Sequence, residues 1–389
     1  MNTLVRVWFA IILVAVVMSG CGDECTNPDL AGHIQVSLNM LGSESDIGEC
    51  AVILDNTVTD TISADEPVVF SNVDVGSHLI RLENLSVNCS VSGENPRAIK
   101  VQAGQTAETV FDISCEDAPF GRIAFSSNRR SGSHDIWVMN ADGSNLMNLT
   151  PVSGTDNWAE WSRDGRKIAY NSNATGNDEI YVMYQDGSYP ARLTDNPAYD
   201  GCPSWSPDGT KIAFTSTRDG NREIYVMNAN GTDQVNLTND TSWDHHAAWS
   251  PDGTRIAFSK QIEGKGEIFV MNADGSDPVN LTNVWYKDEE PAWSPDGTKI
   301  AYMSFRVSGQ TIYIMNADGS GQTDVTASVG STIIDQPTWS PDGLMIAFRS
   351  FGEGLNNSEI FIMNIDGSEL LNITNSPAYD QYPAWSPGP

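Results

Sequence analysis

Trp205-Ser206-Pro207-Asp208-Gly209 is a five-residue phrase that the chain repeats. It returns from Trp249, Trp293 and Trp339, and variants of it begin at Trp161 and Trp385. Successive tryptophans are 44, 44, 44, 46 and 46 residues apart, by subtraction of these residue numbers. A repeat of about 40–45 residues that holds four short strands is typical of propeller blades. The spacing therefore predicts an all-β fold that contains a six-bladed β-propeller.

Each repeat has the same order of strands and turns. A first strand of the type 122–125 is followed by a second of the type 136–139, an Asn-x-Asp-Gly turn and a weaker third strand such as 148–150. Asp-Gly supplies the positive φ angles that tight hairpins need. The fourth strand ends in the Trp motif, where Pro and Gly favour a turn and the indole offers an apolar face for packing between blades. We interpret the motif as a structural repeat and not as a ligand site.

The first and last repeats are incomplete in complementary ways. The chain starts its first repeat at Gly121 without a Trp strand, and its last Trp strand has no successor. We expect residues 382–386 to form the innermost strand of the blade that begins with 122–150, because this pairing removes open sheet edges. The propeller would then occupy 121–389.

Residues 33–117 precede the repeats and show no helical period. Short expected strands alternate there with turn-rich stretches, which predicts a small antiparallel β-sandwich. The seven expected strands cover 33–40, 50–55, 67–71, 78–83, 87–90, 98–102 and 109–114. The stretch Val75-Gly76-Ser77-His78-Leu79-Ile80-Arg81-Leu82 resembles a strand of PEGA-type and carboxypeptidase-regulatory-like modules. That resemblance implies a spacer or adhesive module.

The N-terminus carries a targeting signal. Arg6 precedes an apolar run over 7–18, which predicts a signal peptide over 1–20. Met18-Ser19-Gly20-Cys21 resembles the bacterial lipobox, which implies lipidation of Cys21, a lipidated linker over 21–32 and an anchor in the outer membrane, facing the periplasm or the cell surface. The alternative is plain secretion, with Cys21 in a disulfide.

The other cysteines fit an oxidising compartment. Cys25, Cys50, Cys89 and Cys115 precede the repeats and allow three pairings, of which we favour Cys25–Cys50 with Cys89–Cys115. Cys202 is expected to be a buried thiol.

The charge balance excludes one class of partner. The formal net charge is -30, with 51 acidic and 21 basic residues. A chain without a basic patch cannot replace the counterions of a phosphate backbone, so nucleic acid is not expected as a partner.

Two phrases carry a family resemblance. Residues 205–214 read WSPDGTKIAF and residues 223–228 read EIYVMN, and both recur in register through 121–389. They resemble the PD40, or TolB-type, WD40-like propeller repeat. The resemblance implies a six-bladed propeller, often periplasmic and used for protein–protein contact. TolB itself has an α/β domain before its propeller and no lipid anchor, so the chain is expected to be TolB-like but not an orthodox TolB.

Aspartates recur before the Trp motifs. One stands five positions before Trp in most repeats, and in the fifth it stands only four before, where we expect a slip or bulge. The set is Asp156, Asp200, Asp244, Asp288, Asp335 and Asp380. The carboxylates would form an acidic ring at a channel mouth that attracts a basic peptide segment or Ca²⁺, or each would cap its own turn.

The residue three positions before each Trp differs from blade to blade, as expected for a site placed on a repeat. These candidate channel-mouth residues are Trp158, Cys202, His246, Glu290, Gln336 and Tyr382. His245, His246, Glu289 and Glu290 are weak candidates for a transition-metal site, since adjacent residues on a strand point to opposite faces. Tyr199, Trp243 and Tyr379 would add aromatic surface.

These observations favour a binding protein over an enzyme. The sequence has no Gly-x-Ser-x-Gly elbow and no P-loop. We expect a monomeric, envelope-anchored and non-catalytic protein without a cofactor, which binds a protein or peptide at the channel mouth. The alternatives are a metal-assisted polysaccharide lyase of the propeller type and a structural or adhesive surface lipoprotein.

Overall fold

The computed structural model describes residues 31–41, 50–62, 66–83, 89–115, 121–130, 132–152, 154–306, 309–327, 329, 333–351 and 357–388. The expected signal peptide, Cys21 and Cys25 lie outside these residues. In the described part of the chain, no helix has the length and apolar character needed to cross a membrane. The strands of the described residues form eight four-stranded sheets.

The region before the repeats contains two of these sheets, with strand orders β4-β1-β8-β6 and β3-β2-β5-β7. Their strands are β1 (Ala31–Leu41), β2 (Cys50–Leu54), β3 (Val58–Ile62), β4 (Val68–Asp74), β5 (Gly76–Glu83), β6 (Cys89–Ser92), β7 (Arg97–Val101) and β8 (Thr106–Cys115). Ile34, Phe70, Ile80 and Phe111 from the two sheets share one buried core. This is the two-layer arrangement of a β-sandwich.

Two details of the sandwich differ from the expectation. It is not purely antiparallel, because β1 and β8 pair in parallel, from His33 opposite Thr106 to Leu41 opposite Ser114. It also has an eighth strand, β3, at the edge of its sheet. Four of the five β3 residues are exposed, so the strand lacks the apolar pattern that marks a buried one.

The cysteines of the sandwich support one of the two expected pairs. Cys50 is a free thiol buried in the core, so the expected bridge from Cys25 to Cys50 is not made. Cys89 and Cys115 lie directly opposite each other in the β6–β8 ladder. Residues directly opposite each other in an antiparallel ladder have Cα atoms close enough for a disulfide, and the Cys89–Cys115 bridge stays a prediction.

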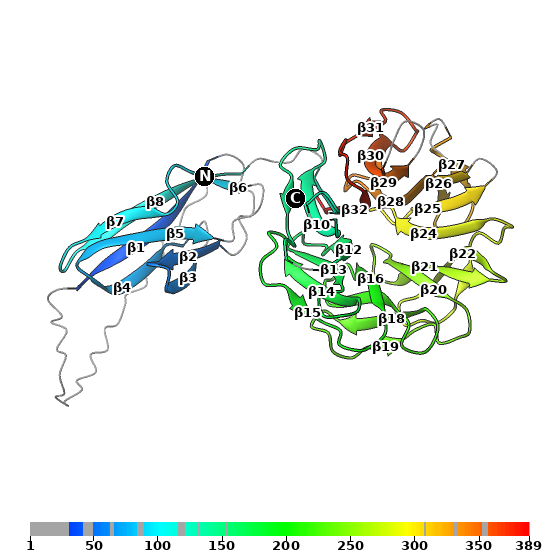
Figure 1. Cartoon of the computed structure of the whole chain (residues 1–389), viewed down its shortest axis with the longest axis horizontal. Coiled ribbons are helices and arrows are strands. Elements are labelled where there is room, and N and C mark those ends of the chain that lie inside the picture. The colour runs from blue at the N-terminus through cyan, green and yellow to red at the C-terminus, as the bar shows by residue number, and fades with distance from the viewer. Residues whose placement is uncertain are drawn as a thin grey trace, which may run out of the picture.

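The repeats form six blades, numbered here I to VI, around a common axis (Figure 1). Blade I consists of β9 (Arg122–Ser127), β10 (Asp135–Asn140), β11 (Met147–Asn148) and β32 (Asp380–Trp385). Blade II consists of β12 (Asp156–Trp161), β13 (Lys167–Ser172), β14 (Glu179–Tyr184) and β15 (Ala191–Arg192). Blade III consists of β16 (Asp200–Trp205), β17 (Lys211–Ser216), β18 (Glu223–Asn228) and β19 (Val235–Asn236).

Blades IV to VI repeat this plan. Blade IV consists of β20 (Asp244–Trp249), β21 (Arg255–Ile262), β22 (Lys265–Asn272) and β23 (Val279–Asn280). Blades V and VI consist of β24 (Lys287–Trp293), β25 (Lys299–Arg306), β26 (Gly309–Asn316), β27 (Thr323–Asp324), and β28 (Ile333–Trp339), β29 (Met345–Phe351), β30 (Glu359–Asn364), β31 (Leu371–Asn372). The innermost strands β12, β16, β20, β24, β28 and β32 contact one another in a closed ring. The predicted six-bladed propeller is confirmed.

The Trp motif forms the turn between the two inner strands of a blade. In blade III the Ser206 hydroxyl accepts a hydrogen bond from the Lys211 N–H (2.9 Å) and donates one to Asp208 Oδ1 (2.6 Å). Gly209 has a φ of 68°, a left-handed conformation that glycine adopts without strain. Ser, Asp and Gly therefore fix the turn with their own atoms, which explains why the motif recurs without any ligand.

The tryptophans pack between neighbouring blades. Trp205 of blade III shares a core with Ile180 and Val182 of blade II. The indole N–H of Trp293 donates to the Ala248 carbonyl oxygen of the preceding blade (3.2 Å), and that of Trp339 donates to Ala292 (3.0 Å). The motif thus joins blades by apolar contact and by hydrogen bonds.

The ring closes where expected. β32, from the end of the chain, pairs with β9 and becomes the innermost strand of blade I. Trp385 lies opposite Ile123, and the Ser386 hydroxyl accepts a hydrogen bond from the Arg122 N–H (2.9 Å).

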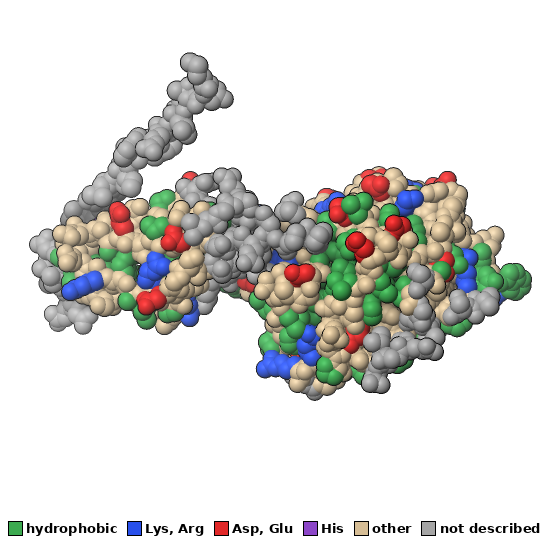
Figure 2. All heavy atoms as spheres, turned by 90° about the horizontal axis from the view of Figure 1, so that it is seen from above, with side chains coloured by type: hydrophobic (Ala, Val, Ile, Leu, Met, Phe, Trp, Pro, Cys, Tyr) green, Lys and Arg blue, Asp and Glu red, His purple; other side chains and the backbone are tan. Residues whose placement is uncertain are grey.

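Charged side chains are dispersed over the visible face of the molecule. Figure 2 shows acidic and basic groups scattered among polar ones, and no basic area dominates the view. This face offers no continuous positive surface to a phosphate backbone.

Candidate functional site

The candidate site is the central channel, and a bulge in every innermost strand shapes it. In each blade the ladder between the innermost strand and its neighbour shifts register at the same place, for example between Gly201 and Ser204. The residue three positions before each Trp lies in this bulge with a positive φ of 53–59°. The six are Trp158, Cys202, His246, Glu290, Gln336 and Tyr382, and all of them line the channel.

The bulge also explains how neighbouring blades are held together at this level. A bulged residue leaves the ladder, so its N–H needs another acceptor. The preceding blade supplies it. The His246 N–H donates to Thr215 Oγ1 (3.3 Å), and the Glu290 N–H donates to Ser259 Oγ (3.0 Å).

In blades VI and I the acceptor is itself a channel-lining side chain of the preceding blade. The Gln336 N–H donates to Glu290 Oε2 (2.8 Å), and the Tyr382 N–H donates to Gln336 Oε1 (2.7 Å). Burial and the nearby Asp335 carboxylate raise the pKa of Glu290. Glu290 and Gln336 therefore serve to position Tyr382 as well as to line the channel.

Aromatic rings close one end of the channel. Trp158 of blade II stacks on Tyr382 of blade I, with ring centroids 3.9 Å apart, and its other neighbour is His246 of blade IV at 4.6 Å. We call these three side chains the aromatic floor. Burial lowers the pKa of His246 well below its usual value, so this ring is neutral.

Above the aromatic floor lies a cavity of about 260 Å³. The innermost strands run from the floor to the Trp motif, so the far end is formed by the residue two places after each Trp. That residue is proline in five blades and Arg163 in blade II; the prolines are Pro207, Pro251, Pro295, Pro341 and Pro387. We call this ring the proline mouth.

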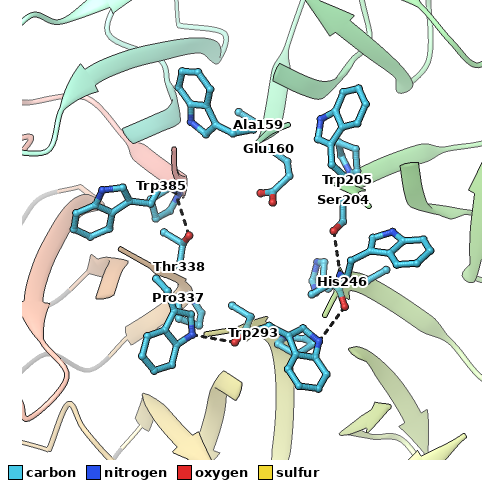
Figure 3. Close-up of a pocket in the computed structure, with 18 of the residues that line it drawn as sticks. Ala159, Glu160, Ser204, Trp205, His246, Trp293, Pro337, Thr338 and Trp385 are labelled. Carbon is cyan, nitrogen blue, oxygen red and sulfur yellow. Dashed lines mark hydrogen bonds between the residues drawn. The ribbon is translucent and has the colours of Figure 1, made fainter. Parts of the chain in front are cut away.

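The residue just before each Trp forms the wall between floor and mouth. It is glutamate in blade II and small in the other five; Ser204, Ala248, Ala292 and Thr338 line the cavity, and Ala384 holds the same position in blade I. Figure 3 shows Glu160 reaching toward the middle of the opening, whereas the indoles of Trp205, Trp293 and Trp385 point away from it. Burial raises the pKa of Glu160 to about 8. Among the described residues, Glu160 has no hydrogen-bond or ion-pair partner.

The raised pKa of Glu160 predicts an effect of pH on stability. The folded protein keeps the Glu160 proton up to a pH of about 8, whereas in the unfolded chain the pKa of this carboxyl group is the usual 4.5. The free energy of unfolding therefore falls as pH rises between these values. We expect Glu160→Gln to stabilise the protein by about 1–3 kcal/mol at pH 8.5 and much less at pH 5. Urea unfolding at both pH values measures this, with Glu263→Gln on the surface as control, and an equal change at both pH values would contradict it.

The aspartates do not form an open acidic ring. Asp156, Asp200, Asp244 and Asp380 begin the innermost strands, Asp288 is the second residue of its strand, and none is more than 4% exposed. Several bind within their own blades: Asp200 pairs with Arg218 (2.8 Å), Asp244 with Lys260 (3.0 Å) and Asp380, at the ring closure, with Arg129 (2.7 Å). Burial raises the pKa of Asp156, Asp244 and Asp288 to about 6.

Asp335 is not the sixth member of this set. Ile334 faces Ser350 as Asp288 faces Ser304, so Ile334 occupies the equivalent place. Asp335 stands one position later and pairs with Arg349. The expected extra slip in blade VI is therefore wrong. The bulge there is the same as in the other blades, and the difference is a substitution of Asp by Ile.

The four candidate metal ligands diverge. His245 Nε2 lies 3.5 Å from Glu289 Oε1, and Glu289 also pairs with Lys287 (2.8 Å). His246 and Glu290 instead face the channel, where His246 belongs to the aromatic floor and Glu290 binds Gln336. In the described part of the chain no group of three or more His, Cys, Asp or Glu side chains could hold a metal ion.

The aromatic residues at the strand starts also separate. Trp243 and Tyr379 are 50% and 47% exposed, whereas Tyr199 packs inward with its hydroxyl 3.5 Å from Cys202 Sγ. Cys202 is a free buried thiol, as expected, and burial raises its pKa to about 12. Sequence reasoning missed Glu160, although a signal was present: it is the one charged residue at a position that is otherwise Ala, Ser or Thr.

Comparisons with known proteins agree with this geometry. The PD40 family, described as the TolB beta propeller domain, matches residues 193–290 and 284–388. TolB from Acinetobacter baumannii is similar in structure, with a TM-score of 0.63 and 27% sequence identity over 70% of this chain and 68% of that one. No curated protein sequence matches the chain.

Two further solved structures share the fold alone. A candidate TolB from Agrobacterium tumefaciens matches with a TM-score of 0.53 and 20% identity, over 69% of this chain and 98% of that one. Hydrazine synthase from Kuenenia stuttgartiensis matches with a TM-score of 0.57 and 17% identity, over 68% of this chain and 46% of that one. The six repeats, their closure and the family match lead to one conclusion: the chain belongs to the PD40 family of TolB-type β-propellers.

Proposed function

We propose that the protein is a non-catalytic binding protein of the cell envelope, which holds a segment of a partner protein at the proline mouth. The observation that carries this proposal is the cavity itself. The repeats build a uniform scaffold of tryptophans and turns, and the channel residues are those that differ between blades. A shared scaffold with a varied lining is the pattern of a recognition site.

Two further points support the proposal. The similarity to TolB from Acinetobacter baumannii covers 70% of this chain, and the TolB-type resemblance implies protein–protein contact. The lipobox-like stretch that ends in Cys21 would anchor the protein to a membrane, where partners of other envelope proteins are within reach.

A site-specific crosslink tests this function. A photoreactive phenylalanine analogue placed at Arg163, which is exposed at the proline mouth, is expected to form an adduct of defined mass with a partner in intact cells. The same analogue at Val235, which is 55% exposed on the outer strand β19, serves as control. Adducts from position 163 that are absent from position 235 support the proposal. No adduct at 163, or the same adducts at both positions, would refute it.

A further inference from the structure

The cavity is asymmetric, and blade II supplies the asymmetry. Its Glu160 replaces a small wall residue, and its Arg163 replaces a proline of the mouth. The remaining wall is formed by small or apolar residues, including Ala248, Ala292 and Pro337. A ligand that approaches this wall therefore meets the carboxyl group of Glu160 among small and apolar side chains, whereas the second carboxyl group of the channel, that of Glu290, is engaged by the Gln336 N–H.

Glu160 is a costly residue to keep in this position. A carboxyl group that is removed from bulk water without a partner is destabilising. The neighbouring blades show that Ala, Ser or Thr fits the same place in the ring. An ionisable group without a partner in a cavity is a candidate for ligand binding, since a cationic ligand would provide the missing partner.

The floor of the cavity also suits a cation. Trp158 and Tyr382 are stacked on each other, and His246 is neutral. Aromatic rings attract cations, and burial strengthens that attraction. Both features of the cavity, the carboxyl on the wall and the aromatic floor, therefore select for positive charge.

The acceptors of the cavity favour an ammonium over a guanidinium group. Arginine carries five N–H donors in a rigid fork, whereas lysine carries three on a flexible stem. Besides Glu160, the wall offers the hydroxyl oxygens of Ser204 and Thr338, and these already accept the main-chain N–H groups of Trp249 and Trp385. Guanidinium donors would remain unpaired in such a cavity, which is unfavourable.

We propose that the cavity receives the side chain of a lysine from the partner protein, whose ammonium group pairs with the Glu160 carboxylate above the aromatic floor. The inference rests on the proposed function, because it names the chemical group that a partner inserts through the proline mouth. The apolar wall contacts the aliphatic stem of the lysine, and Arg163 at the mouth repels a second cation.

Binding should then depend on pH in a defined direction. The ammonium group pairs with the ionised form of Glu160, so affinity rises from pH 6 to pH 9 and levels off below the lysine pKa of about 10.4. The other ionisable groups facing the cavity are Arg163, Cys202, His246, Glu290 and Tyr382. Burial raises the pKa of Cys202 and Tyr382 to about 12 and lowers that of His246, so all three side chains stay neutral between pH 6 and pH 9. Burial and the Asp335 carboxylate also raise the pKa of Glu290, so the loss of the pH dependence in Glu160→Gln is what assigns that dependence to Glu160.

Calorimetry on the full chain with small probes tests the inference. The probe is N-acetyl-lysine methylamide, and the isosteric N-acetyl-norleucine methylamide, which lacks the charge, is its control. At pH 8.5 we expect the lysine probe to bind at least about tenfold more tightly than the norleucine probe and the corresponding arginine probe. Alanine methylamide, whose amine is an N-terminus, should also bind more weakly.

Variants identify the group responsible. Glu160→Gln is expected to lower the affinity for the lysine probe at least about tenfold and to remove the pH dependence of that affinity. The affinity for the norleucine probe should stay unchanged. Glu263→Gln, which removes an exposed carboxylate from a hairpin, should change none of these values. Urea unfolding confirms that each variant is folded.

The outcomes separate this inference from the proposed function. Equal affinity for the lysine and norleucine probes, tighter binding of the arginine or N-terminal amine probe, or an unchanged affinity in Glu160→Gln would overturn the lysine assignment. If the crosslink at position 163 still forms in that case, the protein binds a partner by other chemistry. If both results are negative, the proposed function fails as well.

Discussion

A chain that ends at Ala378 is expected to lose more than about 5 kcal/mol of stability and to aggregate, because it lacks the strand that closes the ring. The deleted β32 supplies the innermost strand of blade I. With it go the buried indole of Trp385 and the ion pair between Asp380 and Arg129. The truncation also leaves β9 and the inner face of β28 uncovered, and open strand edges pair with other chains.

Urea unfolding and light scattering measure this effect. A matched control ends at Pro387 and removes only Gly388 and Pro389, which follow β32. The control should unfold as the full chain does. A cooperative and monomeric propeller in the chain that ends at Ala378 would show that closure is not required for stability.

Trp293→Ala is expected to lower the free energy of unfolding by about 3–5 kcal/mol. The indole is only 8% exposed, and it packs in one core with Ile268 of its neighbour, blade IV. Its loss would leave a cavity between blades IV and V and would break the hydrogen bond to the Ala248 carbonyl oxygen.

Trp285→Ala provides the matched control for this substitution. Trp285 lies eight residues earlier in the chain, is 83% exposed and contacts Lys265. An exposed side chain of this kind contributes little, so we expect a change below about 0.5 kcal/mol. Equal losses for the two variants, read from urea midpoints, would mean that the Trp motif is not the joint between blades.

The number of blades, their order and the closure could be predicted because local chemistry encodes them. Ser206, Asp208 and Gly209 fix a turn through contacts within five residues, and the same letters at a constant interval give the same turn. The position of β32 followed from the count of strands, since each blade needs four.

The shape of the channel could not be predicted in the same way. Positive φ angles usually occur at Gly or Asn, yet the bulged positions hold residues such as Trp158, His246 and Tyr382. Their conformation depends on acceptors in the neighbouring blade, for example Thr215 for the His246 N–H, which sequence does not place. The role of Glu160 also depends on the closed ring, because one strand alone does not reveal that a cavity lies beside it.

Asp335 was grouped with the other aspartates because it is the same residue type, although it stands one position closer to its Trp. The register shows that Ile334 stands in the equivalent place, so distance from Trp was the better guide than residue type. The parallel pairing of β1 with β8 was missed for a related reason, since hairpin-like spacing says nothing about partners far apart in sequence.

The pairing of β32 with β9 also has a consequence for folding during synthesis on the ribosome. Arg122 and the Ser386 that it contacts are 264 residues apart in the chain. At about 5–20 residues per second, a ribosome needs roughly 13–53 s to make the stretch between them. Throughout that interval the inner edge of β9 has no partner strand, although β10 pairs with its other edge. Until β32 is made, the edge of β9 that it covers is open to pairing with strands of other chains.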